Sequence, residues 1–161
     1  MADIPWWEGT DSTFSHGFMD FVLALSGLRR SVGRLHDQDD PYTALECCWW
    51  IAAATEACGL SHEDSQLAGV YWVRSKGIHE TATAMGQMLD AGRNELEPGV
   101  MLTIPESRWI RLDGSEDGRR ATYNRYLAGK TVASTVNDAY ERLLRIFDEV
   151  RTASGVTDLD V

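Results

Sequence analysis

The chain has 161 residues, of which 43% are hydrophobic, and it carries a formal charge of −10. This length and composition predict one folded domain with its own core and exclude a disordered chain. The charge excludes a protein that coats nucleic acid non-specifically, because such binding needs clustered lysines and arginines.

The first predicted helix follows three capping residues, Asp11, Ser12 and Thr13. Apolar side chains then recur at the steps of three and four that are typical of a helix: Phe14, Phe18, Phe21, Leu25, Leu28, Val32 and Leu35. The run Asp37-Gln38-Asp39-Asp40-Pro41 ends this helix and begins the next, since proline suits a first helical turn.

The second predicted helix, about Pro41 to Cys58, is apolar on nearly every side, which is typical of a central helix. Glu46 and Glu56 are its only charged residues, and Gly59 closes it. The apolar stretch over residues 45–60 is interrupted by these glutamates and is too short to span a bilayer, so we expect no membrane segment.

The three cysteines all lie in this second helix: Cys47, Cys48 and Cys58. Their number is odd and their spacing is not that of a zinc site, so we expect buried free thiols. Free thiols are typical of a reducing compartment. The first residues also lack the basic and apolar regions of a signal peptide. We therefore expect a cytoplasmic protein.

A third helix is predicted to begin at Ser61 and to end at Ala91-Gly92. Its apolar stripe contains Leu67, Tyr71, Ile78, Ala82, Met85 and Leu89. Residues 93–122 hold two of the four prolines and several glycines, which predicts a long irregular connection. Within it, residues 101–104 and 108–112 are candidates for a small hairpin.

A short helix is predicted over residues 120–127, and the last helix begins at about Thr131. One face of the last helix is apolar: Val132, Val136, Tyr140, Leu143, Phe147 and Val150. Four helices joined by two short links and one long one predict an all-α fold, an antiparallel up-down four-helix bundle. We expect one domain over residues 1–153 and a polar, frayed tail over 154–161.

No residue pattern indicates a metal or cofactor site. The four histidines show no ligand spacing, and the glycines near residue 30 lack a phosphate-binding pattern. A nucleophile-elbow motif is also missing from the sequence. We therefore expect neither a metal nor a cofactor.

Arg74 stands out because it falls on the apolar stripe of the third predicted helix, between Tyr71 and Ile78. A charge at such a position is costly unless it is paired or reaches an open cleft. His79 follows after four residues, and Ser75 lies one turn before His79 on the same face. This pattern predicts a small polar face that a ligand or another helix can approach.

The phrase Tyr71-Trp72-Val73-Arg74-Ser75-Lys76-Gly77-Ile78-His79 resembles the Arg-x4–6-His signature of HEPN domains, in the form aromatic-x-x-Arg-Asn-x-x-x-His. The stretch over residues 123–130 is also similar to small actinobacterial and phage proteins that carry this signature. Many HEPN proteins are metal-independent endoribonucleases that act as homodimers. The resemblance therefore implies an endoribonuclease that dimerises through its third helix, in a toxin, defence or phage–host setting.

The resemblance also implies roles for the two motif residues. His79 would act as general acid or base on the ribose 2′-hydroxyl or the leaving oxygen, since its pKa lies near neutrality. Arg74 would stabilise charge on the phosphate in the transition state, because its planar guanidinium can bind two oxygens. Arg74 and His79 of both protomers would line one cleft.

Other residues would support this site. Ser75 occupies the place of the family's usual polar residue, and Tyr71 is the leading aromatic residue of the motif. In such proteins an acid on the preceding helix often orients the arginine. Glu46 is the candidate for this role, and Glu56 is the alternative.

Two other interpretations remain open. One is a HEPN-like chain without activity, an interaction or regulatory module that binds a nucleotide or a protein such as an antitoxin or host factor. The other is an unrelated helical bundle. In both cases Arg74 would be a structural residue, paired with Glu46 or Glu63.

Residues 108–130 contain six basic and three acidic side chains, which predicts a local positive patch on an acidic protein. Tyr123 and Tyr126 lie among these arginines, a mixture that is typical of single-strand binders. The candidates for contact with RNA or a partner are Lys76, Arg119, Arg120, Arg125 and Trp109. Tryptophans outside the helices, Trp109 and the pair Trp6-Trp7, are candidates either for a partner surface or for the core.

Overall fold

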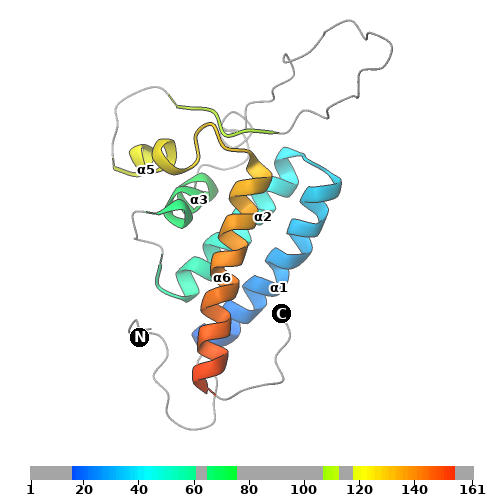
Figure 1. Cartoon of the computed structure of the whole chain (residues 1–161), viewed down its shortest axis with the longest axis vertical. Coiled ribbons are helices and arrows are strands. Elements are labelled where there is room, and N and C mark those ends of the chain that lie inside the picture. The colour runs from blue at the N-terminus through cyan, green and yellow to red at the C-terminus, as the bar shows by residue number, and fades with distance from the viewer. Residues whose placement is uncertain (1–15, 61–64, 76–106, 113–117, 155–161) are drawn as a thin grey trace, which may run out of the picture.

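The computed structural model describes residues 16–60, 65–75, 107–112 and 118–154 (Figure 1). These ranges contain no strand and five helices: α1 (His16–Asp37), α2 (Pro41–Ala57), α3 (Gln66–Arg74), α5 (Gly118–Tyr126) and α6 (Val132–Ser154). The expected all-α class is therefore confirmed for the described part of the chain. None of these helices is both long and apolar enough to cross a membrane.

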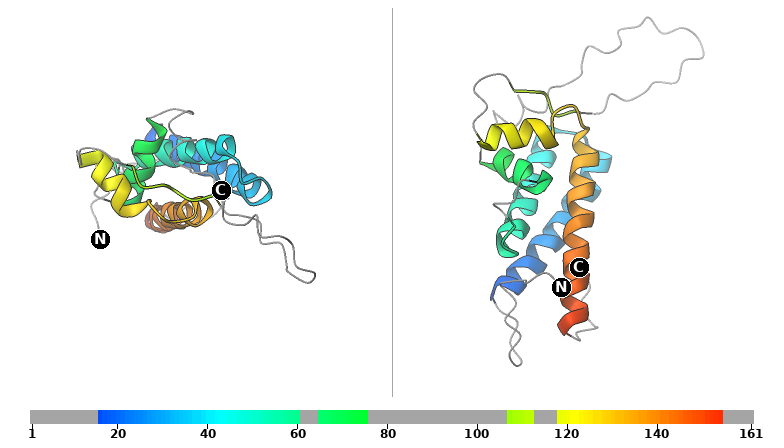
Figure 2. Two further views of the ribbon diagram at one scale, coloured as in Figure 1. Left: turned by 90° about the horizontal axis from the view of Figure 1, so that it is seen from above. Right: turned by 60° about the vertical axis from the view of Figure 1, so that its left-hand side comes forward.

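Three long helices, α1, α2 and α6, lie side by side (Figure 1). A short link joins α1 to α2, and the two helices run in opposite directions. The short helix α3 packs against α2, and α5 packs on α3 (Figure 2). Buried side chains from all five helices form one core, in which the Phe18 ring of α1 stacks on Phe147 of α6 at a centroid distance of 6.2 Å.

Both ends of α2 lie where the capping residues in the sequence predict them. Pro41 begins the helix, and the carboxylate of Asp40 caps it by accepting the backbone N–H groups of Tyr42 at 2.8 Å and Thr43 at 3.1 Å. The Thr43 hydroxyl donates to the same carboxylate. At the other end the backbone turns at Gly59, whose φ of +73° favours glycine.

Asp40→Ala should lower the free energy of unfolding by about 1 kcal/mol, the usual cost of losing a helix N-cap. Partial burial raises the pKa of Asp40, but the hydrogen bonds from Thr43 and Tyr42 outweigh it and hold the pKa below its ordinary value of 3.8. The folded chain therefore favours the ionised form, so the cap stabilises above the ordinary pKa and is lost as the pH falls through the depressed value.

Urea unfolding of Asp40→Ala and of Asp40→Asn as a function of pH checks this prediction. Asparagine is also a good N-cap, so Asp40→Asn should retain most of the stability at neutral pH and lose less than the parent chain on acidification. An Asp40→Ala deficit that stays constant down to pH values far below 3.8 would contradict the assignment.

The helix α3 begins later than predicted. Ser65 is its N-cap, with a hydroxyl that accepts from the Ala68 N–H, and the helix starts at Gln66. Ser61, the expected cap, lies outside the described residues, as do residues 76–92 of the predicted helix. The described helix ends at Arg74, and Ser75 is its C-cap.

Close packing between α3 and α5 depends on Gly69. A Cβ atom added there would lie 2.5 Å from Cδ1 of Leu127, which is fully buried, and 3.7 Å from the Cα atom of Tyr123. Glycine inside a helix costs about 0.5–1 kcal/mol relative to alanine. The close approach of the two elements therefore explains why this position lacks a side chain.

Gly69→Ala should lower the free energy of unfolding by about 1–2 kcal/mol, since overpacking outweighs the gain in helix propensity. The matched control is Gly33→Ala on α1, where an added Cβ would meet no heavy atom of the described chain within 4 Å. That exposed change should stabilise by about 0.5–1 kcal/mol. Urea midpoints that move in the same direction for both variants would contradict this packing.

The described part of the long connection pairs with the start of α6. The N–H of Trp109 donates to the Lys130 carbonyl at 3.0 Å, and the Gly129 N–H donates to the Trp109 carbonyl at 2.7 Å. Arg108 forms an isolated antiparallel bridge with Thr131. The hairpin partner predicted for residues 108–112 was the segment 101–104, which lies outside the described residues. The pairing that the structure has is with residues 129–132.

Trp109 is buried, with 1% of its surface exposed, and its ring meets Tyr123 edge-on at a centroid distance of 6.4 Å. The Tyr123 hydroxyl donates to the carbonyl of Ile110, and the Asn124 side chain bonds both backbone groups of Leu112. The interpretation of Trp109 as an RNA or partner contact is therefore wrong. Its indole is part of the core beneath α5.

The predicted short and last helices are confirmed as α5 and α6, with boundaries within two residues of those expected. The expected break between them is at Gly129, which has a φ of +84°. The apolar face of α6 packs on the core through residues that the periodicity had identified: Val132, Val136, Leu143, Phe147 and Val150.

Candidate functional site

The candidate site begins with Arg74, the last residue of α3. Its Nη1 atom lies 3.5 Å from Oε1 of Glu56 on α2, and its guanidinium carbon lies 5.7 Å from the centroid of the Tyr71 ring. The Tyr71 hydroxyl donates to the same Glu56 oxygen at 2.6 Å. Arg74, Tyr71 and Glu56 therefore form one polar cluster between α2 and α3.

This cluster is open to water. The side chain of Arg74 is 39% exposed and that of Glu56 is 44% exposed. Solvent screens an ion pair of this kind, so the contact contributes little to stability and mainly orients the guanidinium. Arg74 does not lie on the buried side of α3, which is formed by Leu67, Gly69, Val70, Trp72 and Val73.

Glu46 was expected to orient Arg74, and this assignment is wrong. The Glu46 carboxylate pairs with Arg34 of α1 and accepts the indole N–H of Trp50 at 3.4 Å. The carboxylate that contacts Arg74 is Glu56, the alternative. Glu63, another expected ion-pair partner of Arg74, lies outside the described residues.

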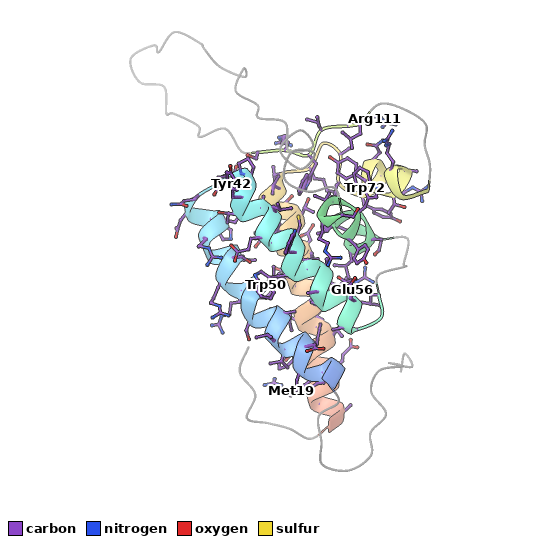
Figure 3. The ribbon with its side chains drawn as sticks, turned by 180° about the vertical axis from the view of Figure 1, so that it is seen from behind. Met19, Tyr42, Trp50, Glu56, Trp72 and Arg111 are labelled. Carbon is purple, nitrogen blue, oxygen red and sulfur yellow. The ribbon has the colours of Figure 1, made fainter. Side chains whose placement is uncertain are left out.

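Arg74 lies at the edge of a pocket of about 360 Å³ over the outer face of α2. The pocket is lined by Tyr42, Leu45, Glu46, Trp49, Trp50, Ala53 and Arg74. Figure 3 shows this face of α2, with Tyr42 at one end of the helix, Glu56 at the other and Trp50 between them. Tyr42 is 71% exposed and Trp49 is 58% exposed, so aromatic rings are accessible beside a guanidinium.

Two ion pairs border this face of α2, one on each side. Arg34 reaches Glu46 from α1, and Arg74 reaches Glu56 from α3. The Trp50 ring lies against α1, where a Cβ added at Gly27 would be 2.5 Å from it. The open face was not predicted, because α2 is apolar on every side and no period in its sequence distinguishes an exposed side from a buried one.

The remaining motif residues are only partly described. Ser75 donates its hydroxyl to the Trp72 carbonyl at 2.6 Å, so it closes the end of α3. His79 and Lys76 lie outside the described residues. The pairing of Arg74 with His79 therefore stays a prediction from the sequence.

The basic candidates of α5 lie apart from this pocket. Arg125 is exposed, with its guanidinium carbon 6.0 Å from the Tyr126 ring centroid, and Arg120 is half-buried. The side chain of Arg119 lies outside the described residues. Arg74 is the one arginine among the described residues that line the pocket. Tyr123 is fully buried against Trp72 and is not accessible to a nucleic acid.

The three cysteines are free and buried in the core. Burial raises the pKa of the Cys47 thiol to about 11 and raises that of Cys48 further. Neither thiol therefore ionises near neutral pH, which argues against a nucleophilic role. In the described part of the chain, no three His, Cys, Asp or Glu side chains are grouped so that they could hold a metal ion.

Comparison of the chain with protein-family models, with curated proteins and with solved structures finds no match.

Proposed function

We propose that this chain is a HEPN-like endoribonuclease that cleaves RNA without a metal ion and acts as a homodimer built on a four-helix antiparallel bundle. Its motif is Arg74, four intervening residues and His79. The observation that carries the proposal is the state of Arg74, whose guanidinium is held by Glu56 and Tyr71 yet remains 39% exposed beside an aromatic pocket.

In the proposed reaction the ribose 2′-oxygen forms a bond to the adjacent phosphorus as the bond from phosphorus to the 5′-oxygen breaks. A base accepts the 2′-hydroxyl proton and an acid protonates the leaving 5′-oxygen, and His79 has the pKa range for either step. Arg74 stabilises the charge that develops on the phosphate oxygens. The products are a 2′,3′-cyclic phosphate and a free 5′-hydroxyl.

The surroundings of Arg74 suit this role in two ways. Glu56 and Tyr71 limit the rotation of the guanidinium, so less conformational freedom is lost when it binds a phosphate. Tyr42 and Trp49 present exposed rings on which unpaired bases can stack. A single local phosphate contact of this kind is compatible with a net charge of −10, whereas a general polyanion surface is not.

The test is incubation of the purified chain with a mixed-sequence single-stranded RNA in the presence of EDTA. Fragments should accumulate, with 2′,3′-cyclic phosphates at their new 3′ ends. Intact RNA under these conditions, or cleavage that EDTA abolishes, would contradict the proposal.

A second candidate is a HEPN-like interaction module without catalytic activity. The pairing of Arg74 with Glu56 favours it, because a guanidinium that already has a carboxylate partner can serve a structural purpose. The exposed apolar side chains Tyr42 and Trp49 are also typical of protein-binding surfaces. This candidate predicts intact RNA and a stable complex with a protein such as an antitoxin or host factor.

A further inference from the structure

The outer face of α2 is uncovered in the described structure although the helix is apolar on every side. Two neighbouring hollows, of about 360 and 460 Å³, lie along it and share Trp50 and Ala53 as lining residues. Tyr42 and Trp49 remain largely exposed. A helix without a polar side is normally buried on all sides by other parts of a protein. We therefore expect another segment to pack on this face of α2.

The apolar surface continues from α2 on to the first turns of α1. Leu23 of α1 is exposed and lines the larger hollow together with Ala24, and Met19 is exposed nearby. In Figure 3, Met19 lies beyond Trp50, near the start of α1. We call this surface the α2 groove; its apolar lining is formed by Leu23, Tyr42, Leu45, Trp49, Trp50 and Ala53.

We propose that the N-terminal segment of the same chain, Ile4-Pro5-Trp6-Trp7, docks in the α2 groove. The segment carries three large apolar side chains, and its proline restricts it towards an extended conformation that fits along a helix. Two indole rings suit an aromatic-lined groove, and the carboxylates of Glu46 and Glu56 at its borders can accept indole N–H groups.

The position of the first described residue, His16, supports docking of the N-terminal segment in the α2 groove. α1 starts at His16, and Asp20, which lines the larger hollow, is only about 6 Å further along that helix. Trp7 and His16 are nine positions apart in the sequence, so the segment can reach about 30 Å. The groove extends along α2 from Ala57 to Tyr42, about 22 Å, and lies within that reach.

Tethering favours this segment over a second copy. A tethered segment experiences an effective concentration in the millimolar range.

Hydroxyl-radical footprinting of the full chain, read out by mass spectrometry at single residues, tests the proposal. Oxidation of Trp49 and Tyr42 should be slow in the parent chain and should rise severalfold in the double variant Trp6→Ala, Trp7→Ala. The double variant Trp6→Phe, Trp7→Phe keeps the aromatic bulk and should preserve the protection. Tyr140 on α6, which does not line either hollow, is the internal reference.

A cross-linking experiment tests the docking of the N-terminal segment without depending on the folding of the alanine variant. Glu8→Cys combined with Ala53→Cys should form a cross-link within one chain when treated with a short bis-maleimide, since the three native thiols are buried. Glu8→Cys with Ser134→Cys on the exposed side of α6 should not. Cross-links between two chains, or equal oxidation of Trp49 in the parent and alanine variants, would overturn the proposal.

Discussion

Replacing Trp109 with alanine should lower the free energy of unfolding by about 3–5 kcal/mol, the usual cost of truncating a buried tryptophan. Its ring is 1% exposed and contacts Tyr123, while its backbone pairs with Gly129 and Lys130 just before α6. The truncation would open a cavity where the extended segment, α5 and the start of α6 meet. A loss of this size is a large part of the stability of a typical domain.

The neighbouring residue provides the matched control. Ile110 lies in the same segment, but 37% of it is exposed. Ile110→Ala should therefore cost about 1 kcal/mol or less, since little apolar area leaves the core. Trp109→Phe should cost less than Trp109→Ala, because it retains a ring and removes an indole N–H that has no partner in the described part of the chain.

Urea unfolding followed by far-ultraviolet circular dichroism measures these differences. The order of midpoints should be parent, Ile110→Ala, Trp109→Phe and then Trp109→Ala. Equal midpoints for Ile110→Ala and Trp109→Ala would contradict the burial of Trp109 beneath α5.

The elements that the sequence predicted well are those with local causes. The period of three and four in α1 and α6 comes from one buried face on each helix, and that period is visible in the residues themselves. The end signals of α2 act within a few residues: Asp40 bonds to the next turn, and Gly59 provides a positive φ. Neither depends on distant parts of the chain.

The misassigned residues depend on distant contacts instead. The sequence left Trp109 open between a partner surface and the core, because its burial results from pairing with residues about twenty positions later. The choice between Glu46 and Glu56 depends on helix rotation. They are ten positions apart, so they point about 80° apart around α2, one towards α1 and the other towards α3.

The same geometry explains how a strongly acidic chain presents an arginine at its pocket. The two glutamates of α2 are each paired with an arginine from a flanking helix, which offsets their charge at the borders of this face. The guanidinium of Arg74 therefore stays accessible in a local environment that differs from the average of the chain. The overall charge of −10 describes the surface as a whole and does not describe this pocket.

In the RNA cleavage assay, Arg74→Ala should lower the rate by about 10²–10³-fold, the usual effect of removing a group that stabilises transition-state charge. His79→Ala should lower it by about 10²–10⁴-fold, since the proton transfers lose their catalyst. Arg74→Lys keeps the charge but loses the planar fork, so it should recover only part of the rate. Arg145→Ala, a change at an exposed residue of α6, should leave the rate unchanged.

A matched pair of glutamate variants separates orientation of Arg74 from a general effect on folding. Glu56→Gln removes the charge that holds Arg74, so kcat should fall while the unfolding midpoint changes little, because the ion pair is exposed. Glu46→Gln removes an equivalent charge from the same helix but one that pairs with Arg34, so kcat should stay near the parent value. Equal losses for the two variants would contradict a positioning role for Glu56. Unchanged cleavage in Arg74→Ala would exclude Arg74 from the reaction and contradict the proposed catalytic site.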